Sequence, residues 1–126
     1  MTRLRREIVS RDIKFRVWKI SENSYLDVEA WVLDYNGRVI DYTDGVSHQE
    51  DYIVERYTGL KDIDGVEIFE GDIFEGGDYQ FDCVKFQDGK YTINLRGCRS
   101  YDLADFYDMD STPPRVIGNK LENPNL

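Results

Sequence analysis

Residues 57–73 read Tyr57-Thr58-Gly59-Leu60-Lys61-Asp62-Ile63-Asp64-Gly65-Val66-Glu67-Ile68-Phe69-Glu70-Gly71-Asp72-Ile73. Short apolar runs alternate here with turn residues, and Asp64-Gly65 and Gly71-Asp72 each favour a sharp reversal of the chain. We expect Gly71 to turn the chain and Phe69 to be largely buried beside it. Short strands separated by glycine-rich turns at this spacing are typical of a small barrel or sandwich. The stretch therefore predicts the centre of a β domain.

Composition supports a β fold over the whole chain. Of the 126 residues, 42 are Val, Ile, Thr, Tyr, Phe or Trp, and only two are Ala. Such a composition favours strands and excludes an all-helical bundle. The length fits one domain, residues 1–126, because independent domains usually have roughly 100 to 150 residues. We therefore expect a single, mainly β domain.

The part before the central stretch reads as a β extension. Residues 13–20 alternate with a period of two, which predicts a half-buried strand with Ile13, Phe15 and Val17 on one face. Residues 26–32 fit a second strand with Leu26, Val28, Ala30 and Val32 on one face, although an amphipathic helix is an alternative. Asn36-Gly37 predicts a hairpin with a type I′ turn that returns through residues 38–42. We therefore assign residues 1–11 to a lead-in, 12–48 to this extension, 49–120 to a barrel-like body and 121–126 to a tail.

The second half of the body contains further hairpin signals and one helical pattern. Residues 79–86 and 91–95 are expected to pair across the turn at residues 87–90. Leu103, Phe106 and Tyr107 share one helical face, so a short helical turn is expected over residues 101–107. Pro113-Pro114 would end this turn, and residues 116–119 fit a last short strand.

Charge is unevenly distributed along the chain. The formal net charge is −9, yet residues 1–19 carry seven basic residues against two acidic ones, so the remainder carries −14. A protein that coats phosphate backbones needs clustered Lys and Arg, so this balance argues against general nucleic-acid binding. The basic lead-in, residues 1–11, is either a solvated segment or an arm that contacts nucleic acid. The absence of a secretory signal and of a long apolar run predicts a cytoplasmic protein that does not bind membranes.

Few residues in the chain are suited to catalysis or metal binding. Cys83, Cys98 and His48 are the only cysteines and the only histidine, and none lies in a zinc-binding spacing. We expect two unpaired thiols, with Cys83 in the core and His48 in the polar loop 43–51. Residues 62–65 have a faint likeness to a calcium loop, but Gly71 stands where its bidentate Glu should be. The sequence therefore predicts no catalytic residues, no metal, no cofactor and no enzymatic activity.

The central stretch resembles the signature of the YopX family. The resemblance is carried by Tyr57-Thr58-Gly59-Leu60-Lys61-Asp62, by Asp64-Gly65 and by residues 67–73, and it extends to Val116-Ile117-Gly118-Asn119, Glu122-Asn123-Pro124 and residues 13–18. It implies a predominantly β protein whose main body is an SH3-type small barrel. It also implies an origin in bacteriophages and prophages of low-GC Gram-positive bacteria, and it implies no enzymatic activity.

Two groups of residues form the candidate interaction surface. The central signature offers a Tyr and charged residues on turns, although its glycines and apolar residues fit a structural role at the corners of a small barrel. The acidic group after residue 101 could imitate phosphate spacing or could be a solvated helix face. The candidate surface comprises Tyr57, Lys61, Asp62, Asp102, Asp105 and Asp108.

Three classes of function are consistent with the sequence. The first is an interaction module that binds a host or phage protein with a basic face. The second is a nucleic-acid-binding barrel that uses the basic arm, and the third is a small metal-dependent hydrolase. We rank them in this order, because the acidic charge and the lack of a reactive constellation favour the first. The sequence leaves the oligomeric state open, a homo-oligomer included.

Overall fold

The computed structural model describes residues 12–43, 48–76, 79–80, 83–94, 100–103 and 115–126. Within these ranges the protein is mainly β, as the sequence predicts. Its two defined helices, η1 (Ile20–Glu22) and η2 (Gln49–Asp51), are 3-10 turns of three residues each.

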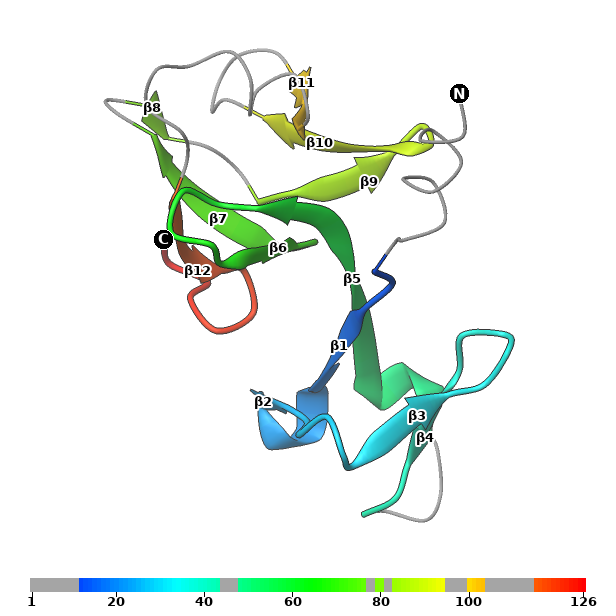
Figure 1. Ribbon diagram of the computed structural model, residues 1–126. Coiled ribbons are helices and arrows are strands. Elements are labelled where there is room, and N and C mark those ends of the chain that lie inside the picture. The colour runs from blue at the N-terminus through cyan, green and yellow to red at the C-terminus, as the bar shows by residue number, and fades with distance from the viewer. Residues whose placement is uncertain (1–11, 44–47, 77–78, 81–82, 95–99, 104–114) are drawn as a thin grey trace, which may run out of the picture. The chain divides into compact units, whose positions relative to one another are not determined.

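The chain divides into two compact units. One consists of Phe15–Glu55 and is called the 15–55 unit; the other consists of Met1–Lys14 with Arg56–Leu126 and is called the 56–126 unit. Strand β5 (Tyr52–Lys61) is continuous and contributes its first four residues to the 15–55 unit and the rest to the 56–126 unit (Figure 1). The boundary between the two units therefore falls within a strand, between Glu55 and Arg56.

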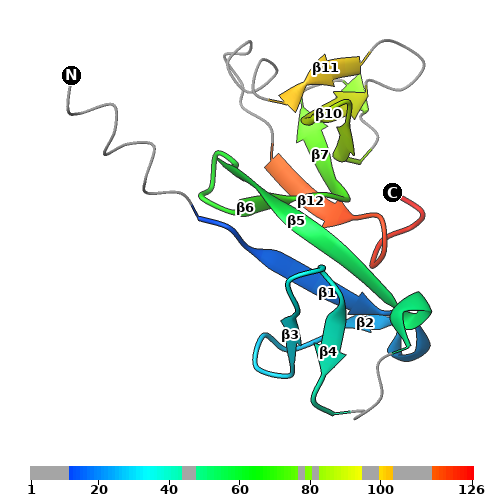
Figure 2. The same cartoon turned by 90° about the vertical axis from the view of Figure 1, so that its right-hand side faces the viewer.

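The 15–55 unit consists of short strands around a small core. Its other strands are β1 (Phe15–Lys19), β2 (Ser24–Tyr25), β3 (Trp31–Leu33) and β4 (Val39–Asp41). Strand β1 lies between β2 and β5, and β3 pairs with β4 in a separate two-stranded sheet (Figure 2). Val17, Val39 and Tyr52 form the buried cluster, and Leu26, Trp31, Leu33 and Val54 pack against it.

The expected strand over residues 26–32 is wrong in both extent and orientation. The amide of Ala30 donates to the carbonyl of Asp27, and this turn separates β2 from β3. A turn of this kind resets the alternation of side chains, so residues of the opposite parity face inward. Val28 is 81% exposed and Val32 39% exposed, whereas Trp31 packs against the core. Ile13, which was expected in the first strand, likewise lies outside β1 and is exposed.

The hairpin at Asn36-Gly37 is confirmed, but its turn type differs from the expectation. Only Gly37 of the pair has positive φ, +79°, and its amide donates to the carbonyl of Asp34. The Asp34 carboxylate accepts hydrogen bonds from the amides of Asn36 and Arg38. This is the three-residue hairpin with a left-handed glycine. The two-residue turn with two positive φ values occurs instead at Asp88-Gly89.

The 56–126 unit contains the remaining strands. They are β6 (Glu67–Phe69), β7 (Asp72–Gly76), β8 (Tyr79–Gln80), β9 (Lys85–Gln87), β10 (Lys90–Asn94), β11 (Ser100–Asp102) and β12 (Arg115–Asn119). Strand β6 pairs with β5, while β12, β7 and β8 form one antiparallel sheet and β11, β10 and β9 form another. The expected pairing across residues 87–90 is present between β9 and β10, whereas β8 pairs with β7.

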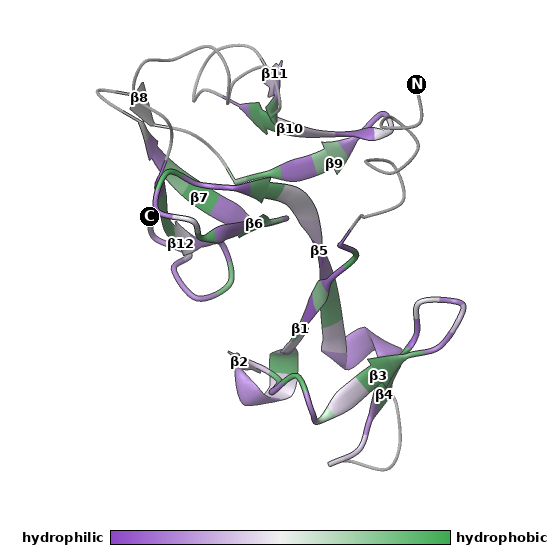
Figure 3. Ribbon diagram, viewed as in Figure 1, coloured by the Kyte–Doolittle hydropathy of each residue, from purple (hydrophilic) through white to green (hydrophobic). Residues whose placement is uncertain are grey.

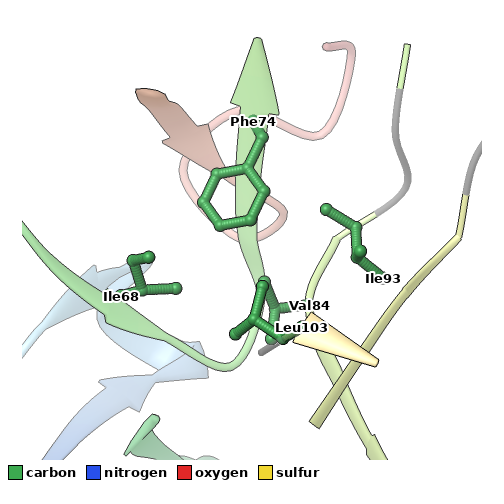
Figure 4. Close-up of a cluster of buried hydrophobic side chains, with 5 residues drawn as sticks. All are labelled: Ile68, Phe74, Val84, Ile93 and Leu103. Atoms are coloured by element: carbon green, nitrogen blue, oxygen red, sulfur yellow. The ribbon is translucent and has the colours of Figure 1, made fainter. Parts of the chain in front are cut away.

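One cluster of buried side chains forms the core of the 56–126 unit. It comprises Ile68, Phe74, Val84, Ile93 and Leu103, shown in Figure 4. Ile68 and Phe69 are neighbours on β6, so their side chains lie on opposite faces of the strand. Phe69 stands opposite Tyr57 and is only half-buried. The expectation that Phe69 is largely buried is therefore met only in part, because the residue of β6 that enters the core is its neighbour Ile68. Gly71 does turn the chain, with φ of +86°.

The helical turn expected over residues 101–107 is corrected at its start. Tyr101 and Asp102 belong to β11, where they stand opposite Ile93 and Thr92 of β10. The strand pairing satisfies their main-chain groups, so local helical periodicity does not decide the structure there. Leu103, which follows β11, has helical geometry, and residues 104–114, which include the rest of the expected turn, lie outside the described residues.

Candidate functional site

Asp62, a residue of the candidate surface, holds a turn together. Its side chain is buried, and one carboxylate oxygen accepts hydrogen bonds from the amides of Asp64 and Val66 at 2.8 and 2.9 Å. The other oxygen accepts from the amide of Val116 at 3.0 Å and so ties the turn to β12. In the β3–β4 hairpin, the Asp34 carboxylate accepts the corresponding hydrogen bonds from the amides of Asn36 and Arg38. Asp62 is therefore a structural residue whose oxygens are occupied by the main chain.

The rest of the central signature also serves the fold. Gly59 has φ of +88° at a register shift between β5 and β6, a conformation that glycine adopts without strain. Thr58 Oγ1 donates to the carbonyl of Ile68 at 2.7 Å and accepts from the amide of Leu60. The buried Asp72 carboxylate accepts from the amide of Phe69.

Tyr57 and Lys61 share one face of β5. Their partners on β6 are Phe69 and Glu67, and the rings of Tyr57 and Phe69 are 5.5 Å apart. Burial is the main cause that raises the pKa of the Tyr57 phenol above its ordinary value, and nearby Glu67 adds to it. Lys14 lies over the Tyr57 ring and hydrogen-bonds Glu67, which raises the pKa of Lys14. Lys61 is exposed, so this face presents charge around a half-buried tyrosine.

The acidic group is described only in part. Asp102 on β11 forms an ion pair with Lys90 on β10, with 2.9 Å between Oδ1 and Nζ. Asp105 and Asp108 lie outside the described residues. The described part of this group is therefore a cross-strand ion pair.

Arg56 lies in a cluster that the sequence analysis did not single out. Its guanidinium is 3.8 Å from the centroid of the Phe86 ring, and its Nε donates to Glu70 at 3.0 Å. The rings of Phe86 and Tyr91 meet edge to face at 5.0 Å. The pairing of Phe86 with Tyr91 across the Asp88-Gly89 turn was readable from the sequence, but the approach of Arg56 depends on tertiary packing.

The β3–β4 hairpin of the 15–55 unit exposes apolar side chains. Val32 and Ile40 stand opposite each other in the register and are 39% and 42% exposed, and Tyr42 is 64% exposed. Figure 3 shows hydrophobic colouring along β3. We call Val32, Ile40 and Tyr42 the outer face of the hairpin. Its other face, with Trp31, Leu33 and Val39, packs on the core. The sequence analysis missed the outer face because it placed Val32 inside.

The 15–55 unit is strongly acidic, with nine acidic residues and three basic ones. Two of the basic side chains are engaged in ion pairs. Arg16 Nε lies 2.8 Å from Glu55 Oε1, and Lys19 Nζ lies 3.1 Å from Asp41 Oδ2.

Asp41 is the most deeply buried of these charges. Burial raises the pKa of its carboxyl, but hydrogen bonds from Thr43, Tyr52 and Lys19 outweigh this effect and hold the pKa well below its ordinary value. Asp41 is therefore ionised at neutral pH and balances the Lys19 ammonium.

Within the described ranges no three His, Cys, Asp or Glu side chains are grouped so that they could hold a metal ion. Cys83 is a half-buried free thiol, and Cys98 lies outside these ranges. His48 is exposed and immediately precedes η2. None of the helices described is both long and apolar enough to cross a membrane.

The C-terminal motif is also built for structure. Asn119 Oδ1 accepts from the amides of Leu121 and Glu122, while Asn123 Oδ1 accepts from the amide of Asn119. A Cβ on residue 118 would lie 2.5 Å from Asn123 Oδ1, which explains the glycine there. The motif Gly118-Asn119…Asn123 thus folds the last residues back on β12.

Comparisons with known proteins agree with these motifs. The profile of one family, described as YopX protein, matches residues 14–126. The chain belongs to the YopX family. The crystal structure of protein EF1440 from Enterococcus faecalis is similar to this YopX chain, with a TM-score of 0.57 and 21% identity over 92% of this chain and 98% of EF1440. At this identity the likeness concerns the fold alone. No curated protein sequence matches the chain.

The residues that mark this chain as a YopX protein are thus mostly residues that shape it. Asp62, Gly59 and Asp72 hold the central turns, and Asn119 and Asn123 hold the C-terminal one. Of the six residues of the candidate surface, Tyr57 and Lys61 share a partly accessible face. Function is therefore better sought on side chains that the fold does not require.

Proposed function

We propose that this YopX protein is a non-enzymatic interaction module that binds a host or phage protein with a basic face. The observation that carries this proposal is the charge of the 15–55 unit. This unit contains nine acidic residues and only three basic ones. Two of the basic side chains, Arg16 and Lys19, form ion pairs with Glu55 and Asp41 of the same unit. Exposed Asp27 and Glu29 precede β3, which contributes Val32 to the apolar outer face. Such a surface attracts a basic partner and offers apolar area for binding it.

The fold is compatible with this role. We infer that the 56–126 unit is an SH3-type small barrel, a proposal supported by its short antiparallel strands around one core. Small barrels serve as scaffolds for many binding functions, which is an argument by analogy. We further propose that the protein acts in the cytoplasm of a bacterial host and originates from a phage or prophage.

The proposal is tested by affinity capture with the full-length chain. The tagged protein is incubated with nuclease-treated lysate of a Gram-positive bacterium, and the retained proteins are identified by mass spectrometry. We expect proteins with basic surfaces that elute as salt rises, because salt screens attraction between exposed charges. The variant Asp27→Lys/Glu29→Lys should lose them.

A matched control separates local from general electrostatics. Asp12→Lys/Glu75→Lys makes the same change of charge at exposed positions of the 56–126 unit. It should retain the partner. Equal loss from both variants would contradict a site on the 15–55 unit. Capture from an untreated lysate that is absent from the nuclease-treated one would favour the nucleic-acid-binding class.

A further inference from the structure

Resting on this proposed function, we propose that the 15–55 unit binds its partner by strand addition at the outer edge of β3. The partner would contribute an extended segment with alternating basic and apolar side chains. Its main chain would pair with Trp31 and Leu33, and its apolar side chains would extend the outer face of the hairpin.

The register of the hairpin shows which main-chain groups point outward. The amide of Tyr42 donates to the carbonyl of Ala30, and the amide of Asp34 donates to the carbonyl of Arg38. Hydrogen-bonded pairs alternate with non-bonded pairs along an antiparallel ladder, so Val32 and Ile40 form the next bonded pair. The amides and carbonyls of the residues on either side of Val32 therefore point away from β4.

These outward groups on β3 are unpaired. Among the described strands, β4 is the only neighbour of β3 in the sheet. Within the described part of the chain, the main-chain groups of Trp31 and Leu33 have no hydrogen-bond partner. Unpaired edges of this kind accept an additional strand, in which main-chain hydrogen bonds give affinity and side-chain contacts give specificity.

The opposite edge of the same hairpin is covered, because Asp41 is only 2% exposed and the main-chain groups of Val39 are bonded by a side chain. The amide of Val39 donates to Gln49 Oε1, and Gln49 Nε2 donates to the carbonyl of Val39, both at 2.8 Å. A side chain here satisfies the groups that a neighbouring strand would satisfy. Of the two edges, β3 is therefore the one available to a partner.

Charge complementarity identifies the type of partner. Exposed Asp27 and Glu29 lie just before β3, and Asp34 follows it. Basic side chains on the added segment would be attracted to these carboxylates. A second copy of this chain would bring the same acidic residues together, so we commit to a basic segment of another protein. Apolar side chains alternating with the basic ones would lie beside Val32 on the outer face.

The test uses a defined peptide and the full-length protein labelled with ¹⁵N. The probe is an acetylated and amidated peptide, Lys-Val-Lys-Val-Lys-Val-Lys, and the control peptide has Glu in place of Lys. We expect the probe to shift the amide resonances of Trp31 and Leu33 and to slow the hydrogen exchange of both. The Glu peptide should bind more weakly by about tenfold or more.

Two modifications separate the parts of the proposal. Val32→Lys/Ile40→Lys places charges on exposed positions of the outer face and should weaken binding by about tenfold. The matched control, Ile20→Lys/Ile53→Lys, adds the same two charges at positions of the same unit that are 49% and 36% exposed and outside the β3–β4 hairpin, and should change the affinity less than about twofold. A probe methylated at alternate main-chain nitrogens should lose binding if strand pairing is the mechanism.

Several results would overturn the inference. Equal binding of the methylated probe would exclude main-chain pairing, and self-association through β3 would replace the basic segment with a second copy. Failure of the probe to bind, or resonance shifts confined to Arg56 and Phe86, would remove the β3 site. Equal capture of proteins by the wild type and by Val32→Lys/Ile40→Lys would also remove the β3 site, but it would leave the proposed function intact. Loss of all protein capture would instead remove the proposed function.

Discussion

The side-chain amide of Gln49 bonds both the amide and the carbonyl of Val39, each at 2.8 Å. Val39 is fully buried and belongs to β4, whose outer edge would otherwise expose these groups. Natural proteins commonly cover sheet edges to prevent unwanted pairing. Gln49 does so here with two reciprocal bonds, and it leaves β3 as the open edge of the hairpin.

Replacing Gln49 by Ala should destabilise the protein. The two main-chain groups of Val39 would be left buried without partners, at a cost of about 1 to 3 kcal/mol. Urea unfolding followed by fluorescence measures the loss. The neighbouring Glu50→Ala is the control, because the Glu50 side chain is 82% exposed. Equal stability of Gln49→Ala and Glu50→Ala would show that the two hydrogen bonds contribute nothing.

The buried pair of Lys19 and Asp41 should make the free energy of unfolding depend on pH in the acidic range. The pKa of Asp41 is lower in the folded protein than its ordinary value of 3.8, so the unfolded chain binds the proton more readily. The contribution of Asp41 to stability is therefore present above about pH 4 and is lost as the pH falls toward the folded-state pKa. Urea unfolding at a series of pH values should show this loss, reduced in Asp41→Asn.

At neutral pH, Asp41→Asn should also cost about 3 kcal/mol, because it leaves the Lys19 ammonium in a buried position without its main counter-charge. The double variant Lys19→Met/Asp41→Asn removes both charges and should recover much of the loss. If the double variant is no more stable than Asp41→Asn, the two residues are not energetically coupled.

The sequence predicted the positions of turns better than it predicted which side chains of a strand face the core. Asp34 and Asp62 form their turns through bonds to nearby amides, so the sequence signal is local. The orientation of Val32 depends on a turn after Asp27 that resets the alternation. The edge closed by Gln49 depends on a contact between residues ten positions apart. Neither is encoded in periodicity.

The register of β6 gives a stability prediction. Ile68 is fully buried in the core, so Ile68→Ala should cost about 2 to 5 kcal/mol. Phe69→Ala should cost less, because the ring is half-buried and packs mainly on Tyr57. Thermal unfolding of both variants checks the order. A larger loss of stability for Phe69→Ala than for Ile68→Ala would show that Phe69, and not Ile68, faces the core.

Gly118 gives a prediction about the C-terminal motif. A Cβ at this position would displace the Asn123 side chain from the amide of Asn119, so Gly118→Ala should cost about 1 to 3 kcal/mol. Asn123→Ala removes the nearer of the two side chains that the Cβ would meet, the other being Leu126 at 2.8 Å. The double variant should therefore lose less than the sum of the two single losses. Strict additivity in thermal unfolding would contradict this account.

The last prediction concerns nucleic acid. Residues 20–126 carry a formal charge of −14, and the basic residues at the start of the chain act over only about 8 Å at physiological salt. We therefore expect negligible affinity for duplex or single-stranded nucleic acid at about 0.15 M salt, measured by fluorescence anisotropy. Binding at low salt should disappear when residues 1–11 are deleted. The same loss is expected when their four arginines are replaced by Gln, which keeps the length of the chain. Submicromolar binding at physiological salt that survives both changes would place a nucleic-acid site elsewhere on the chain, and the aromatic rings stacked with Arg56 would then be the first residues to replace.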